Sequence, residues 1–158
     1  MIIRPVALAI IRNNEGHLLV QELNFPGNPT TFYRPIGGTM EPGENSKQTL
    51  IRELKEELDQ EIEEPNLVAV IENIFGTEED MGHENVFMYE ARFKDAAVYL
   101  EEELAGLEGT EPYRAMWKPI DWFVETDEDV KLIPDGLLNY LLNNGDESQQ
   151  TITHIKTR

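Results

Sequence analysis

Cysteine is absent from the chain of 158 residues. Disulfides, thiolate metal sites and a cysteine nucleophile are therefore excluded. Basic residues are also few, because 13 Lys and Arg stand against 31 Asp and Glu and give a net charge of −18. A chain this acidic repels a nucleic-acid duplex and an anionic membrane, so we expect neither as a partner. A divalent cation bound locally would still allow an anionic small molecule to bind.

The first residues of the sequence favour neither a leader segment nor a membrane span. The start, MIIRPVALAII, has no basic region and reaches Asn13 too early for a signal peptide or a membrane span. A cytoplasmic protein is the resulting expectation. The length and the 40% content of hydrophobic residues suit one globular domain. We predict a single domain over residues 1–145 and a frayed C-terminal tail at 146–158.

Apolar runs and turn residues alternate along the chain without an internal repeat or a long linker. The turn residues from Asn13 to Gly16 predict a hairpin between the first two strands. Strands precede and flank two helices, an order that indicates the α/β (α+β) class with a mixed β-sheet covered by helices. The acidic segment at 99–108 is compatible with a helix or a loop. Strands are expected within 4–25 and at 32–38, 66–75, 85–93 and 113–119, a polar loop at 76–84, and helices at 46–60 and 134–144.

The expected helix at 46–60 has the clearest pattern in the chain. Asn45 and Gln48 suit the N-cap and N3 positions of a capping box. At about 100° per residue, four apolar side chains share one arc of the helix, which predicts that this arc packs on a sheet. They are Leu50, Ile51, Leu54 and Leu58.

Three glutamates, Glu53, Glu56 and Glu57, share a second arc of the same helix. Like charges at this spacing repel by roughly a few tenths of a kcal/mol each, and burial makes the repulsion larger unless a cation offsets it. Hard divalent cations prefer carboxylate oxygens, and Mg²⁺ commonly bridges them to substrate phosphates. The arc is therefore a candidate metal site, with a solvated acidic helix face as the alternative interpretation.

The spacing around this helix resembles the Nudix box, G-x5-E-x7-R-E-U-x-E-E-x-G-U, in which U is a bulky apolar residue. Asp59 stands where the family has glycine, and Gln60 stands where it has an apolar residue. These departures predict a different helix end and leave the acidic arc intact. The resemblance extends over about residues 3–143 and implies a Nudix-type α/β/α sandwich. The matching positions are Gly38, Glu44, Arg52, Glu53, Leu54, Glu56 and Glu57.

The resemblance also implies a chemistry for the acidic arc. Nudix enzymes cleave diphosphate linkages in nucleoside diphosphates joined to another moiety, with Mg²⁺ or Mn²⁺ as the cofactor. It implies that Glu56 and Glu57 are the main metal ligands and that the carbonyl of Gly37 adds an oxygen. Glu53 is then a further ligand or the general base. A glutamate beyond the box sometimes completes such a site, and the candidates are Glu101, Glu102 and Glu103, which otherwise form an acidic turn.

Two arginines have expected roles beside these ligands. Arg52, counted with the glutamates among the catalytic box residues, pairs with Glu44 or the loop backbone and holds the carboxylates in place. Arg34 is a substrate-binding candidate whose fork of donors suits a phosphate or a structural salt bridge. The remaining candidates are Phe32, Tyr33 and Tyr89 for base stacking or core packing, His83 in the polar loop, and Trp117 and Trp122 for packing.

The substrate class implied by the resemblance is a small nucleotide with a diphosphate linkage. ADP-ribose-like nucleotides, dinucleoside polyphosphates and nucleoside triphosphates are all compatible with the sequence, with a nucleoside diphosphate derivative favoured. A non-catalytic Nudix-type module that senses a nucleotide is the alternative. Such modules usually lose box glutamates, whereas this chain keeps them all, which favours the enzyme. The fold that is implied often forms homodimers.

Overall fold

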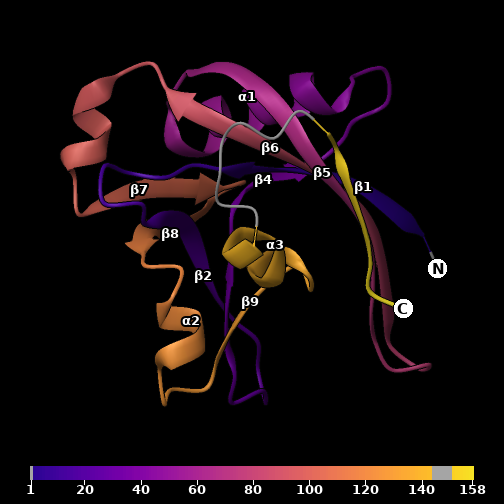
Figure 1. Ribbon diagram of the computed structural model, residues 1–158. Helices are drawn as coiled ribbons and strands as arrows, with labels where there is room; N and C mark the ends of the chain where they lie inside the picture. The colour runs from indigo at the N-terminus through magenta and orange to yellow at the C-terminus, as the bar shows by residue number, and fades with distance from the viewer. Residues whose placement is uncertain (1, 144–150) are drawn as a thin grey trace.

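The computed structural model describes residues 2–143 and 151–158, which form two five-stranded mixed sheets with helices packed around them (Figure 1). The first sheet has the strand order β10-β5-β6-β1-β4, and the second has the order β7-β8-β2-β3-β9. The elements, in chain order, are β1 (Ile3–Ile10), β2 (Leu18–Asn24), β3 (Thr31–Arg34), β4 (Ile36–Thr39), α1 (Ser46–Leu58), β5 (Ile62–Gly76), β6 (Met81–Phe93), the 3₁₀ helix η1 (Ala96–Leu100), β7 (Glu103–Glu108), β8 (Glu111–Lys118), α2 (Trp122–Glu125), β9 (Val130–Leu132), α3 (Leu137–Asn143) and β10 (Thr153–Lys156).

Strand β1 is buried on both faces, which explains its nearly continuous apolar sequence. Val6 and Leu8 belong to a core cluster that also contains residues of α3, whereas Ala7 and Ala9 belong to a second cluster that contains the apolar residues of α1. Alternation along the strand therefore places the two helices on opposite sides of the first sheet (Figure 1). The predicted α+β class and α/β/α arrangement are confirmed.

The strands divide between two sheets, where the sequence predicts one sheet. The turn after β1 forms as expected, with Arg12 bridged to Leu18, but β1 and β2 then diverge into different sheets. The expected strand at 32–38 is likewise two strands, because Pro35 lacks the N–H group that a continuous strand would need. Strand β3 joins the second sheet and β4 joins the first. This division leaves room for α1 to contact both sheets, since its core cluster includes residues from each.

Other differences lie near the ends of the expected elements. The expected loop at 76–84 is largely absorbed into the hairpin of β5 and β6. The ambiguous segment at 99–108 contains the end of η1 and all of β7. The helix expected at 134–144 begins only at Leu137. No helix within 2–143 or 151–158 has the length and apolar character needed to cross a membrane.

The prediction of a frayed tail is wrong for its last part. Residues 144–150 lie outside the described part of the chain, but Thr153–Lys156 form β10, which pairs in parallel with β5 (Figure 1). Ile155 packs against the core cluster beneath α3. The hydroxyl of Thr157 accepts a hydrogen bond from the backbone N–H of Ile74 at 2.8 Å. Pairing with the edge of an existing sheet supplies the order that this short segment does not have alone.

Candidate active site on the acidic face of α1

Helix α1 begins as its sequence predicts. The side chain of Asn45 accepts a hydrogen bond from the backbone of Gln48, and the side chain of Gln48 accepts one from the backbone of Asn45, both at 2.9 Å. This capping box satisfies two backbone donors that have no partner within the helix. Leu50, Leu54 and Leu58 are buried as expected. Ile51 is not, because 44% of it is exposed, so the buried arc is narrower than the apolar arc in the sequence.

The helix ends at the position where this chain departs from the Nudix box. Asp59 adopts a left-handed conformation with φ 53° and ψ 39°, which glycine adopts most easily and aspartate tolerates better than most residues. Its backbone N–H donates to the carbonyl of Lys55 at 3.0 Å, and the N–H of Gln60 donates to the carbonyl of Leu54 at 3.4 Å. The helix therefore closes in the ordinary way without glycine, and the acidic arc keeps its position.

Arg52 lies at the centre of the acidic face. Its guanidinium donates to both carboxylate oxygens of Glu44, at 3.1 and 2.6 Å, and to the backbone carbonyl of Thr39 at 3.3 Å. The same group donates to Glu53 at 3.0 Å and to Glu56 at 3.2 Å. The surrounding carboxylates raise the pKa of Arg52, so it stays charged. One cation thus connects the loop before α1 to two glutamates on the helix.

Glu44 is held by several donors at once. Besides Arg52, the backbone N–H of Glu41 donates to it at 2.8 Å and the hydroxyl of Thr49 donates at 2.7 Å. These contacts, with the Arg52 hydrogen bonds as the largest cause, lower the pKa of Glu44 to about 2. Glu44 is therefore a fully charged anchor for Arg52 rather than a group that exchanges protons.

Glu57 is buried on the inner side of the same helix, with only 6% of the residue exposed. Burial, together with the neighbouring carboxylate of Glu53, raises its pKa to about 8, although a hydrogen bond from the hydroxyl of Tyr113 at 2.9 Å opposes this shift. A buried carboxylate next to a second one lacks compensating charge. Of the three box glutamates, Glu53 and Glu57 are therefore brought together, whereas the side chain of Glu56 is mostly exposed.

The two glycines in the middle of β4 are required by close contacts. A Cβ on Gly38 would lie 2.5 Å from the carboxyl carbon of Glu53, so this glutamate lies directly against the strand. A Cβ on Gly37 would lie 2.0 Å from the carbonyl oxygen of Ala7 in β1. Gly38 is thus the glycine beside Glu53, whereas Gly37 packs against the backbone of β1.

One face of the second sheet lies near Glu57 and holds Arg34 together with two residues that the sequence did not single out, Gln21 and Glu108. Cross-strand pairs place Gln21 beside Arg34 on one side and beside Ala115 on the other. Gln21 donates to Glu108 at 3.0 Å, and Arg34 lies 3.9 Å from the same carboxylate. The Nε atom of Arg34 and the Oε1 atom of Gln21 are buried without a hydrogen-bond partner among the described residues. Arg34 therefore lies on this face with donor capacity to spare.

Two of the three glutamates expected to complete the site beyond the box have contacts elsewhere. Glu103 forms an exposed ion pair with Arg114 at 3.2 Å, and the backbone carbonyl of Glu101 accepts a hydrogen bond from Trp117. Side chains alternate along β7, so Glu108 rather than Glu103 lies on the face that looks toward α1. Its charge contributes to the raised pKa of Glu57. The sequence alone predicts which of these glutamates faces α1 only if 103–108 is already known to be a strand.

The aromatic candidates are mainly packing residues. Tyr33 and Tyr89 are buried in the two core clusters, and the hydroxyl of Tyr89 lies 2.6 Å from that of Ser46. The remaining contacts are those of Phe32 with Phe25, of Trp117 with Tyr99, and of Trp122 with Tyr33 and with the ammonium group of Lys118. His83 lies in β6, paired with Ile3 of β1.

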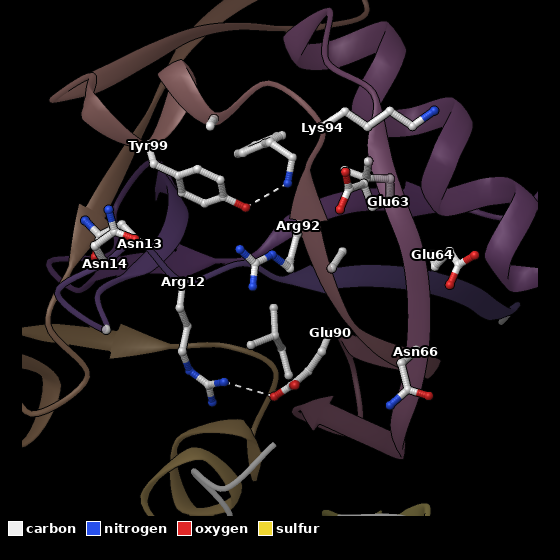
Figure 2. Close-up of a pocket in the computed structure, with 16 residues that line it drawn as sticks. Arg12, Asn13, Asn14, Glu63, Glu64, Asn66, Glu90, Arg92, Lys94 and Tyr99 are labelled. Atoms are coloured by element: carbon white, nitrogen blue, oxygen red, sulfur yellow. Dashed lines mark hydrogen bonds and ion pairs between the residues drawn. The ribbon is translucent and has the colours of Figure 1, made fainter. Parts of the chain in front are cut away.

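A separate open cavity of about 1170 Å³ lies where β1, β5 and β6 meet (Figure 2). Figure 2 shows Arg12 and Glu90 turned toward each other, joined at 2.9 Å, with Arg92 farther along the same strand as Glu90 and Lys94 just after its end. Its lining contains both acidic and basic side chains. Among the residues described, those of the box do not line this cavity, so it is distinct from the acidic face of α1.

The donor set on α1 fits a hard divalent cation. Within the described residues, no group of three or more His, Cys, Asp or Glu side chains is arranged to hold a metal, and Glu56 contacts Arg52. Glu53 and Glu57 nevertheless offer only carboxylate oxygens, which Mg²⁺ and Mn²⁺ prefer. The raised pKa of Glu57 shows a site where added positive charge is favourable.

The chain is similar to several solved structures of known proteins. An ADP-ribose pyrophosphatase from Streptococcus suis is 13% identical, with a TM-score of 0.63 over 96% of this chain and 98% of that chain. A MutT protein from Bacillus halodurans is 22% identical, with a TM-score of 0.55 over 78% and 72% of the two chains. A UDP-X diphosphatase is 15% identical, with a TM-score of 0.59 over 98% of this chain and 68% of that one.

At these identities the structural likeness shows the fold alone. No curated protein matches the sequence. The family described as NUDIX domain matches residues 2–135, which is most of the chain and includes every box position. The capped helix, its acidic face and the close glycines of β4 lie within that match. The chain therefore belongs to the Nudix hydrolase family.

Proposed function

We propose that the protein is a divalent-cation-dependent hydrolase that cleaves a diphosphate linkage in a nucleoside diphosphate derivative. The observation that carries the proposal is the burial of Glu57 beside Glu53, on a helix whose spacing matches the Nudix box. Two adjacent carboxylates kept out of water are costly unless a cation joins them. Members of the Nudix hydrolase family act on pyrophosphate bonds, and the names of two similar structures, an ADP-ribose pyrophosphatase and a UDP-X diphosphatase, support this substrate class.

Each of these residues has a proposed role. Glu56 and Glu57 are the proposed main ligands, the carbonyl of Gly37 adds an oxygen, and Glu53 is a further ligand or the general base. When bound there, Mg²⁺ or Mn²⁺ supplies neutralisation of the diphosphate charge and lowers the pKa of an attacking water. Arg52 holds Glu53 and Glu56 in place through its own anchor on the loop, as its hydrogen bonds indicate.

Arg34 is the proposed contact for the substrate phosphates. It projects from the end of β3 onto the face near Glu57, and its Nε has no partner among the described residues. Its distance of 3.9 Å from Glu108 is too long for a hydrogen bond. A guanidinium with free donors beside a cation site suits a diphosphate, which offers oxygens in pairs.

Turnover with identified products tests this proposal. Purified protein with Mg²⁺ or Mn²⁺ is incubated with ADP-ribose, a dinucleoside polyphosphate or a nucleoside triphosphate, and the products are identified by mass. We expect AMP and ribose 5-phosphate from ADP-ribose and no turnover when EDTA is present. The variant Glu125→Gln, on the exposed surface of α2, serves as a matched control for Glu57→Gln.

The panel also separates the enzyme from the alternative sensor module. A protein that binds one of these nucleotides in a calorimetric titration, but releases no product from any of them with either cation, would support the sensor and contradict the hydrolase. Retention of Glu53, Glu56 and Glu57 leads us to expect the opposite result.

A further inference from the structure

Tyr113 reaches the acidic face of α1 from a different element. It lies in β8 of the second sheet, and its hydroxyl donates a hydrogen bond to Oε1 of Glu57 at 2.9 Å. The chain separation of 56 residues means that this contact depends on the docking of α1 against the second sheet. Burial and the charge of Glu57 raise the pKa of the hydroxyl, so Tyr113 keeps its proton and remains a donor.

Gly106 fixes the ring of Tyr113 from the neighbouring strand. The two residues are a cross-strand pair of β7 and β8. A Cβ on Gly106 would lie 2.5 Å from Cζ of Tyr113 and 2.8 Å from both adjacent ring carbons. The end of the ring that bears the hydroxyl therefore lies directly against the glycine, and no larger residue leaves the ring where it is.

The hydrogen bond leaves the carboxylate able to bind a cation. A carboxylate has about four acceptor sites on its two oxygens, and the hydroxyl of Tyr113 uses one site on Oε1. Carboxylates that bind metals are commonly held by a hydrogen bond of this kind, which fixes their orientation before the ion arrives. A freely rotating Glu57 would lose more conformational entropy when a cation binds.

We propose that Tyr113, clamped by Gly106, is a positioning residue that orients Glu57 for binding of the divalent cation. This inference rests on the proposed function and deepens it, because it adds to the site two residues that lie outside the Nudix box. Gly106 leaves the space that the ring of Tyr113 occupies, and this position of the ring brings the hydroxyl to Glu57.

Titration of the substrate-free protein with Mn²⁺ tests the role of Tyr113, with the dissociation constant measured by calorimetry. Tyr113→Phe removes only the hydroxyl, and we expect it to raise the Kd about tenfold, within the range usual for partners of metal ligands. Tyr99→Phe is the matched control, since the Tyr99 hydroxyl accepts a hydrogen bond from the backbone of Phe93 instead. We expect its Kd to equal that of the wild type.

A second variant, Gly106→Ala, keeps the hydroxyl and displaces the ring. We expect it to weaken Mn²⁺ binding in the same direction, and the double variant with Tyr113→Phe to bind no more weakly than Tyr113→Phe alone. Independent effects would instead add. Saturating Mn²⁺ should restore most of the turnover that Tyr113→Phe loses at low Mn²⁺.

Four results would overturn one or both of the two proposals. A Kd for Tyr113→Phe within twofold of the wild type overturns the role of Tyr113. If Tyr113→Phe unfolds, unchanged Mn²⁺ binding by Gly106→Ala overturns it equally. A wild type that binds Mn²⁺ but hydrolyses no member of the nucleotide panel contradicts the hydrolase alone, whereas a wild type that binds no Mn²⁺ contradicts both proposals.

Discussion

Arg52 holds Glu44 by two parallel hydrogen bonds, from Nε to Oε2 at 3.1 Å and from the terminal nitrogen to Oε1 at 2.6 Å. This fork geometry fixes direction as well as distance. The remaining terminal nitrogen is then free to contact Glu53 and Glu56. The guanidinium of Arg52 therefore connects the loop before α1 to the acidic face of the helix. A change in the position of the loop should alter the positions of Glu53 and Glu56, and the reverse should also hold.

Replacement of Arg52 by lysine tests this connection. Lysine keeps the charge but cannot form the fork and reach Glu53 at the same time. We expect Arg52→Lys to lower turnover about 10–100-fold, as is usual when support for metal ligands is lost, while circular dichroism shows a folded protein. The control is Arg92→Lys, because Arg92 is exposed on β6 and forms no ion pair among the described residues. Wild-type turnover in Arg52→Lys would show that the fork has no role in the reaction.

Glu57→Gln tests the buried carboxylate itself. The amide keeps the size and loses the charge, so we expect turnover to fall by more than about 100-fold, since even the partners of metal ligands contribute about 10–100-fold. In metal-free buffer the variant should be at least as stable as the wild type, because it replaces a carboxyl group whose charged form is disfavoured by burial with a neutral amide. Thermal unfolding and steady-state rates measure the two effects.

The wild type and Glu57→Gln together also test whether the cation binds at Glu57. A ligand at a hundred times its Kd stabilises the native state by about 2.7 kcal/mol, so millimolar Mg²⁺ or Mn²⁺ should raise the melting temperature of the wild type. Glu57→Gln should show a clearly smaller rise. An equal rise in both proteins would place the cation somewhere other than Glu57.

Features that depend on neighbouring residues could be predicted from the sequence. The capping box of Asn45 and Gln48 and the buried face of α1 depend on contacts within a few residues. The capping box is observed, and the buried face is observed without Ile51, which is 44% exposed. The box spacing also identified Arg52 and Glu44 as a pair, which the structure contains. The family prediction is confirmed because these local features are the family signature.

Features that depend on strand pairing could not be predicted in the same way. Tyr113 and Glu108 approach Glu57 only because β7 and β8 pair in one particular register and α1 docks against them. The acidic run containing Glu103 offered several candidates, and the alternation of side chains along β7 decides among them. Similarly, the division of 32–38 between two sheets follows from a proline whose consequence depends on which strands lie beside it.

The lowered pKa of Glu44 predicts how stability depends on pH. Its pKa falls from 4.5 to about 2 in the folded protein, so the folded state favours the charged form. The stabilisation is fully present above pH 4.5 and is lost as the pH falls from 4.5 toward 2. We therefore expect the gap in unfolding free energy between the wild type and Glu44→Gln to be largest near neutral pH and to narrow through this window.

Urea unfolding at several pH values measures this gap. Comparison of two variants that share every other carboxylate removes the contribution of the remaining acidic residues. Glu125→Gln should show no such narrowing relative to the wild type, because its exposed side chain has no ion pair among the described residues. A constant gap between pH 6 and pH 2 for Glu44→Gln would contradict the assignment of Glu44 as a charged anchor.

Asp59 offers a test of the altered helix end that leaves the acidic face untouched. Its left-handed backbone is cheaper for glycine than for any residue with a Cβ. Asp59→Gly does lose the pair with Lys55, whose charged atoms lie 2.8 Å apart, but both side chains are largely exposed and such pairs contribute little. We expect Asp59→Gly to raise the melting temperature by about 2–4 °C and to leave turnover unchanged. Asp59→Ala, which lacks both the conformational freedom of glycine and the polar side chain of aspartate, should lower the melting temperature. Lys55→Ala measures the loss of the ion pair alone. If the melting temperature of Asp59→Gly is below that of Lys55→Ala, the aspartate is preferred at this turn for its own contacts.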